Sequence, residues 1–249
     1  RIINMNNTNF SPEQSKNDQF FSLLEKIELF KNCTQESKTK IVNHCQFNEY
    51  DIGRPISDGD IIPNSIQIIL EGEARLIGKD NNNKSITIAK LAKGTIVGLG
   101  SILREKCCEQ INASTKVITL SINDNCIIEL YEEDKFFSEW CQNNILPGEI
   151  YSLVKNLVEN LPNSSYNAKT IFNTIYNKCF LTKAEKIDSS LINIVSSSNI
   201  IDYKIGEIIN PEDLIKTNPP FKERIISIPK NIYMEIIKGK DLQYDNKDY

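Results

Sequence analysis

The sequence has little of several residue types, and each shortage argues against a class of function. It holds one histidine, one tryptophan and two methionines among 249 residues. No apolar run reaches the roughly 18 residues that a membrane-spanning helix needs, and the Asn-rich start lacks the apolar stretch of a signal peptide. A net charge of −4 and a pI near 5.3 give no basic footprint for nucleic acid. We therefore expect a cytoplasmic chain that does not insert into a membrane or bind nucleic acid.

Cysteine usage argues against a metal or disulfide framework. The seven cysteines are odd in number and contain no CxxC pair, which argues against a zinc ribbon and against paired disulfides. Most lie among apolar neighbours, a pattern typical of buried, reduced thiols. The adjacent Cys107 and Cys108 leave a sensor of oxidants or metals open, although adjacent cysteines bridge only with strain. We predict no metal site.

The sequence also lacks a convincing catalytic group. The only histidine, His44, stands beside Cys45 on a predicted helix. Adjacent side chains of a helix point about 100° apart, so these two do not form a Cys–His nucleophile pair by themselves. The acids at 132–134 are typical of a helix N-terminus, and Asp58 and Asp60 of a turn. We therefore predict no catalytic residue and expect that this chain is not an enzyme.

What is present is a β-rich middle between helical segments. Residues 18–31 predict a helix with one apolar face, formed by Phe20, Leu24, Ile27 and Phe30. Thr34 is the predicted N-cap of a second helix. From residue 47 the apolar period changes to two, over 47–53, 65–78, 84–94, 115–122 and 125–131, and helices return from about 132. Many short strands without long helices between them predict an α+β fold with an antiparallel jelly-roll barrel.

A polar break at 162–165 predicts a domain boundary. We expect a start that is disordered or added by cloning (1–17), a first domain (18–160), a second segment of helix and strand (166–240) and a polar tail (241–249). Within the second segment, 168–178 and 183–195 are predicted helices. The Tyr-x-Ile-Gly step at 50–53 recurs at 203–206, which indicates a degenerate repeat of the first fold or a chance identity.

Over about residues 18–158 the sequence resembles the cyclic-nucleotide-binding domain family. The resemblance rests on the helix pair, on Tyr50-x-x-Gly53, on Gly72 after a β-rich run and on the turn Gly-Thr-Ile-Val-Gly-Leu-Gly at 94–100. It implies an eight-stranded jelly roll in which a short helix after the Gly turn is the phosphate-binding cassette. Residues 101–115 resemble, more narrowly, the cassette of N-terminal modules of cyanobacterial peptide or toxin ABC exporters, although this chain has no Walker A motif.

The resemblance places any ligand site at Gly98, Leu99, Gly100 and Ser101, with Thr115 or Lys116 opposite. Binding members of the family have a ribose-binding glutamate after the first glycine, where this chain has Leu99, which accepts no hydrogen bond. The family's phosphate-binding arginine falls on Thr115 if residues are counted without gaps. It falls on Lys116 if Ile118, Leu120 and Ile122 must all face the barrel interior. We therefore predict no cofactor: a cyclic nucleotide is disfavoured, and a small anion at the Gly turn stays open.

These features together predict a non-enzymatic regulatory or docking module with a degenerate pocket. The resemblance implies the cytoplasmic N-terminal part of an exporter, at the inner face of the membrane. Its partners would be the rest of the exporter or another protein, and a homodimer is left open. The helices after Tyr131 would transmit a shift through Phe136, Phe137 and Trp140, which helical spacing predicts to share one face. The alternatives are a transcription regulator of the Crp type, which scattered lysines balanced by acids disfavour, and a true cyclic-nucleotide sensor.

Overall fold

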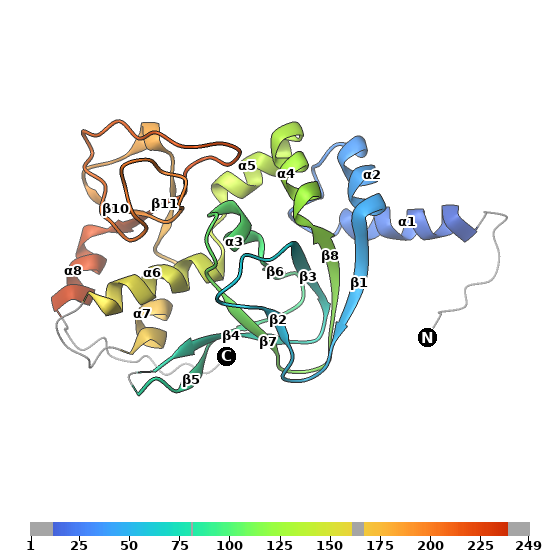
Figure 1. Cartoon of the computed structure of the whole chain (residues 1–249), viewed down its shortest axis with the longest axis horizontal. Coiled ribbons are helices and arrows are strands. Elements are labelled where there is room, and N and C mark those ends of the chain that lie inside the picture. The colour runs from blue at the N-terminus through green and yellow to red at the C-terminus, as the bar shows by residue number, and fades with distance from the viewer. Residues whose placement is uncertain (1–11, 81, 161–166, 239–249) are drawn as a thin grey trace.

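Two four-stranded antiparallel sheets form the centre of the molecule (Figure 1). The computed structural model describes residues 12–80, 82–160 and 167–238. The sheets have the strand orders β1-β8-β3-β6 and β2-β7-β4-β5. The strands are β1 (Cys45–Tyr50), β2 (Pro55–Ser57), β3 (Ser65–Glu71), β4 (Ala74–Lys79), β5 (Ser85–Leu91), β6 (Ile96–Val97), β7 (Gln110–Ala113) and β8 (Val117–Asn123). This is a double-sheet jelly roll. The predicted α+β class is confirmed, although the strands pair as two sheets and not as one closed barrel.

Helices cover the outer face of the first sheet. They are α1 (Pro12–Leu24), α2 (Gln35–His44), α3 (Leu99–Leu103), α4 (Asp124–Glu133) and α5 (Lys135–Asn143). The next helix, α6 (Pro147–Glu159), packs instead against β4 of the second sheet. The predicted face of Phe20, Leu24, Ile27 and Phe30 is buried, and it packs in one core with Ile66 and Leu120 of the sheet. Thr34 caps α2 as predicted, since its Oγ1 accepts a hydrogen bond from the Ser37 N–H at 3.2 Å.

Three local predictions are wrong at the helices. Residues 12–17, expected in the start that is disordered or added by cloning, belong to α1, whose first residue is Pro12; proline suits the first turn of a helix. Residues 125–131 form α4 and not a strand: Asn123 Oδ1 caps the Cys126 N–H at 2.8 Å, and this cap outweighs the β-rich composition. Phe136 is 53% exposed while Phe137 is buried, so the aromatics of α5 do not share one face.

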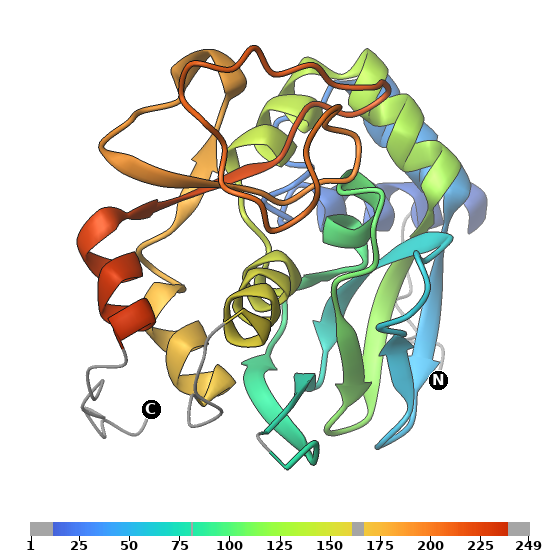
Figure 2. The same ribbon diagram turned by 60° about the vertical axis from the view of Figure 1, so that its left-hand side comes forward.

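The second segment is a small sheet that α7 precedes and α8 follows in the chain, and it lies beside α6 (Figures 1 and 2). It comprises α7 (Ala168–Ile175), β9 (Phe180–Thr182), β10 (Leu191–Val195), β11 (Ile225–Pro229) and α8 (Lys230–Lys238), with the strand order β10-β11-β9. The predicted helix at 183–195 is therefore wrong. A turn in which Asp188 Oδ1 accepts the Ser190 N–H at 2.7 Å starts β10, whose apolar residues are β-branched or leucine.

The second segment shares a core with the jelly roll. Ile171 and Phe172 of α7 and Ile226 of β11 pack in one cluster with Leu76 and Val154 of the first part. The order β11–α8 repeats that of β8–α4, but Gly53 lies three residues after the end of β1 whereas Gly206 lies eleven residues after the end of β10. The division into domains stays a prediction. The predicted break at 162–165 and the tail at 241–249 lie outside the described residues.

Candidate functional site

The glycine turn forms as the sequence predicts. Gly98 has a φ of +89° and precedes α3, a buried helix of five residues. A Cβ atom on Gly98 would lie 3.1 Å from Pro63 Cγ and 3.1 Å from the Ser65 carbonyl oxygen, so glycine is needed here for space as well as for backbone conformation. Leu99 is fully buried in the core between the first sheet and its helices. The position of a ribose-binding glutamate is therefore filled by a core side chain.

An acidic side chain of the protein itself takes the backbone donor of the turn. The Gly98 N–H donates to Oε1 of Glu109, which immediately precedes β7 and is 3% exposed. Burial raises the pKa of Glu109 to about 7; the bond from Gly98 and the charge of Arg104 act against this rise, and Glu149 adds to it. A phosphate at this turn would meet a carboxyl group and not a free N–H. The turn therefore repels an anion whenever Glu109 is charged.

The remaining residues of the turn are also occupied. Ser101 is fully buried, and its Oγ accepts the Cys108 N–H at 3.1 Å. A Cβ atom on Gly100 would lie 3.2 Å from Glu149 Cγ. Burial, with Glu109 nearby, raises the pKa of the Cys108 thiol to about 12, so Cys108 stays protonated and packs as an apolar side chain. The four predicted turn residues lie together, but all four are buried.

Thr115 and Lys116 are not brought to this turn. Both are exposed in the connection before β8, where Thr115 Oγ1 accepts the Glu73 N–H at 2.9 Å. Lys116 Nζ pairs with Glu49 Oε2 at 2.7 Å. Gly98 contacts the first residue of β3, whereas this connection lies at the other end of β3, about 20 Å away at the rise of an extended strand. The predicted six-residue site is therefore split into two distant groups.

The register argument for Lys116 is wrong because both faces of β8 are buried. Leu120 and Ile122 pack toward the helices with Ile66 and Ile68. The face toward the second sheet carries the alternate residues Val117, Thr119 and Ser121. A strand buried on both sides gives no sequence signal for which face is the interior.

A pocket of about 830 Å³ lies between β4, residues 107–110 and α6; we call it the helix-side pocket. Tyr151 of α6 forms part of its wall, since its hydroxyl accepts the Lys79 N–H at 3.2 Å. A Cβ atom on Gly78 would lie 2.6 Å from that hydroxyl oxygen. The charged lining residues are Lys79 and Lys155 against Asp60, Asp80, Glu109 and Glu159. This excess of acids does not suit an anionic ligand.

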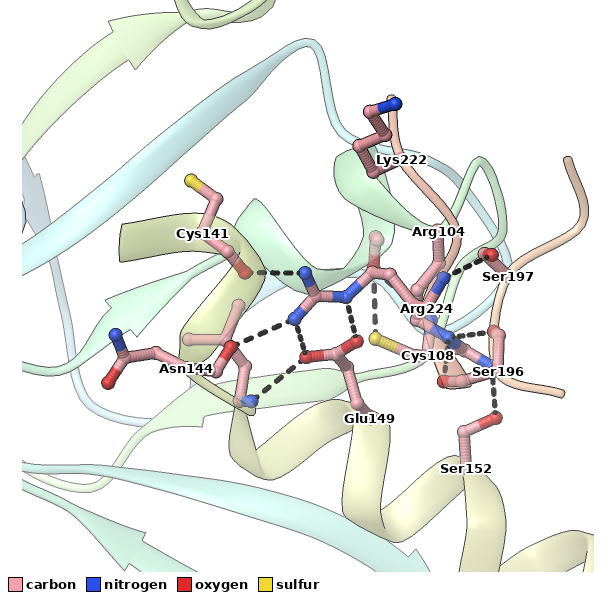
Figure 3. Close-up of polar contacts among 12 residues, drawn as sticks. Arg104, Cys108, Cys141, Asn144, Glu149, Ser152, Ser196, Ser197, Lys222 and Arg224 are labelled. Carbon is pink, nitrogen blue, oxygen red and sulfur yellow. Dashed lines mark hydrogen bonds and ion pairs between the residues drawn. The ribbon is translucent and has the colours of Figure 1, made fainter. Parts of the chain in front are cut away.

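Two buried arginines cross between the jelly roll and the second segment (Figure 3). Arg224, just before β11, is 4% exposed and pairs with both carboxylate oxygens of Glu149 on α6, with 2.7 Å from Nη2 to Oε2. Its Nη1 donates to the Cys141 carbonyl at 2.7 Å, and its Nη2 to the Asn144 carbonyl at 2.9 Å. Every nitrogen of the Arg224 guanidinium thus has a partner. Arg224 joins the second segment to the corner between α5 and α6.

Arg104, at the end of α3, extends from the jelly roll toward the second segment and is 1% exposed. Its Nε donates to the Ser196 carbonyl, and its Nη2 donates to Ser152 Oγ at 2.9 Å. Its Nη1 is buried with no partner, and no carboxylate in the described parts of the chain forms an ion pair with it. Ser198 strengthens the contact, since its N–H donates to the Arg104 carbonyl at 2.9 Å. The end of the predicted cassette helix is therefore fixed by the second segment.

Sequence reasoning did not identify Glu109, Glu149 or the two arginines. Their partners lie far apart in the chain: Arg224 follows Glu149 by 75 positions. One signal was available, since only five of the 29 basic residues are arginine. Arginine is preferred to lysine where a buried, bidentate contact is required.

Known proteins give a fold-level likeness only. No family model and no curated protein matches the chain. A regulatory subunit of a cAMP-independent protein kinase A from Trypanosoma cruzi, bound to guanosine, aligns at 16% identity and a TM-score of 0.41, over 51% of this chain and 48% of that one. A putative cyclic nucleotide-binding protein from Geobacter metallireducens aligns at 18% identity and 0.39, over 52% and 88%. A cyclic nucleotide-binding-like protein from Brucella abortus aligns at 18% and 0.40, over 47% and 100%.

The alignment thus spans about half the length of the Trypanosoma cruzi subunit. At these identities and scores the likeness assigns neither a ligand nor an activity to this chain. The jelly roll stands on its own strand pairing. Within the described residues there is also no cluster of three or more histidine, cysteine or acidic side chains that could hold a metal ion.

Proposed function

We propose that this chain is a non-enzymatic regulatory or docking module whose jelly roll is held by its own second segment and not by a cyclic nucleotide. The observation that carries the proposal is the bond from the Gly98 N–H to the buried Glu109 carboxyl group. It puts an internal acid where a ligand phosphate would bind. The core position of Leu99 supports the same conclusion, since no ribose hydroxyl can be bound there.

The two arginines supply the coupling that a bound ligand would otherwise give. Arg104 ties the end of α3 to Ser196, and Arg224 ties the start of α6 to the second segment through Glu149. Because α3 and α6 are fixed through the same segment, the jelly roll is complete without a ligand. A partner would then bind the assembled surface and not the turn.

Calorimetric titration of the whole chain with cyclic AMP and cyclic GMP, up to millimolar concentration, tests this proposal. We expect no heat of binding. The Glu109→Gln variant keeps an oxygen for the Gly98 N–H and removes the charge, and Glu159→Gln is the matched control in the helix-side pocket. Micromolar binding by the unaltered chain would overturn the proposal and favour a true cyclic-nucleotide sensor.

We further propose that the module is the cytoplasmic N-terminal part of a peptide or toxin exporter. The support is the resemblance of residues 101–115 to the cassette of such exporters. In the described residues no helix has the length and apolar character to cross a bilayer, so the proposal concerns a larger gene product. Fractionation of the tagged, full-length gene product is expected to place it in the membrane with this module on the cytoplasmic side. Recovery in the soluble fraction alone would contradict the proposal.

A transcription regulator of the Crp type is less well supported. Such a protein needs two adjacent helices that place a basic recognition helix on DNA. Between residues 167 and 238 the helices α7 and α8 are separated by the three strands of the small sheet. A gel-shift assay with random duplex DNA at low salt is expected to show no binding.

A further inference from the structure

A second concave site lies between the two sheets, at the end of β3 next to Gly98, and its lining is unusual for a jelly roll. The groove measures about 600 Å³ and lies between β1, β3 and β8 on one side and β2 with residues 58–64 on the other; we call it the strand groove. The space between packed sheets is normally filled by apolar side chains. The far end obeys this rule, with Ile69, Leu76, Ile111 and Val117 in one apolar core.

At the strand groove the same face carries amides and hydroxyls. The pairing aligns Gln46, Ser121 and Gln67 in one row across β1, β8 and β3, because Gln46 and Gln67 both pair with Ser121. Ser65 pairs with Asn123 in the next row on this face. A polar row inside a sandwich opposes the local folding preference, and such conflicts are expected mainly at functional sites.

A buried glutamine organises these groups. Gln67 is 5% exposed, and its amide donates to Ser121 Oγ at 2.8 Å and to Ser65 Oγ at 3.0 Å. Its carbonyl oxygen accepts from Thr119 Oγ1 at 2.7 Å and from Asn48 Nδ2 at 3.4 Å. All four bonding positions of the Gln67 amide are thus used. Because Ser65 and Ser121 already accept from Gln67, each keeps a hydroxyl proton to donate, and a ligand would meet preset donors.

Other polar groups of the groove have no partner within the described residues. They include the side-chain amides of Gln46 and Asn64 and the hydroxyl of Tyr50. Among the described residues the lining contains no lysine or arginine; its titratable side chains are those of Asp58, His44 and Tyr50. A phosphate or carboxylate ligand would therefore find no cation here. Pro55, Ile61 and the ring of Tyr50 supply apolar surface beside the polar row.

We propose that the strand groove binds a neutral, polyhydroxylated small molecule, such as a mono- or disaccharide. Hydroxyls on both edges of a sugar ring donate and accept, which suits amide and hydroxyl side chains, and the C–H face of the ring suits the apolar surface. The volume lies in the range of small-molecule sites. The groove adjoins the Gly98 turn at Pro63 and Ser65, but it shares no lining residue with the predicted ligand site or with the helix-side pocket.

Saturation-transfer NMR of the whole chain with a panel of neutral mono- and disaccharides at millimolar concentration tests the proposal, followed by calorimetry on any sugar that binds. Gln46→Leu removes an exposed lining amide with no folding partner, and Gln110→Leu is the matched substitution in the helix-side pocket. We expect Gln46→Leu to weaken binding about tenfold, the loss of about one hydrogen bond, and Gln110→Leu to leave it unchanged.

Three outcomes overturn the proposal. They are no saturation transfer to any sugar of the panel, equal affinity for Gln46→Leu and the unaltered chain, and a larger loss with Gln110→Leu than with Gln46→Leu. Inorganic phosphate serves as the anionic probe. Its competition with a bound sugar would also count against a groove that selects neutral ligands. Circular dichroism of both variants verifies that the fold is retained.

Discussion

The two buried arginines differ in one respect: Arg224 has a carboxylate partner, whereas Arg104 has none among the residues that the structure describes. Both cross the same boundary, one from the second segment into the jelly roll and one in the reverse direction. Arg224 meets Glu149 and two carbonyl oxygens, which satisfy its whole guanidinium group. Arg104 donates hydrogen bonds to two serine hydroxyls and a carbonyl oxygen, and its Nη1 has no partner within the described residues.

This difference predicts that one arginine mainly stabilises the boundary between the jelly roll and the second segment, and that the other mainly positions α3. A buried ion pair costs much to break because one charge is left behind without a partner. A buried cation held only by neutral groups has already lost much of its hydration, so its removal costs less. Arg224 should therefore dominate the stability of the boundary, and Arg104 should mainly determine where the end of α3 lies.

The largest expected effect is that of Arg224→Met. Removal of the guanidinium leaves the fully buried Glu149 without its cation, and the Cys141 and Asn144 carbonyls without their donors. We expect a loss of about 3–5 kcal/mol in the free energy of unfolding, measured by urea denaturation. Arg75→Met, at an exposed arginine of β4, is the matched control and should change little.

A double variant sharpens this prediction. If the cost arises from an unpaired Glu149, then Glu149→Met combined with Arg224→Met should be more stable than Arg224→Met alone. The recovery should be partial, because Glu149 also accepts the Leu146 N–H at the start of α6. A double variant less stable than Arg224→Met would refute the assignment of Arg224 as an ion-pair clamp.

The next effect in size concerns Glu109, whose pKa is raised by burial although the charge of Arg104 acts against the rise. Burial raises this pKa from 4.5 to about 7, so between those values the folded state binds more protons than the unfolded state. Stability from this group is then present below pH 4.5 and is lost as the pH rises through 7. Glu109→Gln should be more stable than the unaltered chain at pH 8, by up to about 3 kcal/mol, and equal to it near pH 4.

Urea denaturation midpoints of the unaltered chain and of Glu109→Gln, measured from pH 4 to pH 8, test this prediction. A Glu109→Gln chain that is less stable than the unaltered chain at pH 8 would mean that Arg104 and Glu109 act as a pair. The contrast between the two arginines would then fail.

Arg104→Met should have a smaller effect on stability. It loses the bonds to Ser196 and Ser152, but it also removes a buried cation with an unpartnered nitrogen. We expect a loss of about 1–2 kcal/mol, with faster hydrogen exchange at α3 and near Ser198 as the positional signature. A loss as large as that of Arg224→Met, without a local change in exchange, would contradict the division of roles.

Patterns in short stretches of the sequence correctly predicted the features that neighbouring residues determine. The buried face of α1, the Thr34 cap, the larger strands and the Gly98 turn follow from periodicity, capping and backbone freedom. The errors arose where a short signal or a distant residue decided the outcome. Asn123 turned a β-rich run into α4, and the two buried faces of β8 concealed which face was the interior.

The candidate site could be predicted less well than the fold. The turn was found, but its blocking acid, Glu109, lies eleven residues further along, on the return from α3. The bond between Arg224 and Glu149 depends on the docking of the second segment, which no local pattern encodes. The amides of Gln46 in β1 and Gln67 in β3 were visible in the sequence, yet only strand pairing brings them into one row.

The smallest expected effect is that of Lys116→Ala, at one of the two positions where the sequence predicted a phosphate contact. Lys116 lies in the open with Glu49, where solvent screens the ion pair and little stability is gained. Because it also lies at the far end of β3 from the Gly98 turn, no ligand at that turn can reach it. We therefore expect an unchanged urea midpoint and unchanged calorimetric traces with cyclic nucleotides. The contradicting outcome is a cyclic nucleotide that binds the unaltered chain and no longer binds Lys116→Ala. Ligand binding would then depend on this surface lysine more than on the buried arginines.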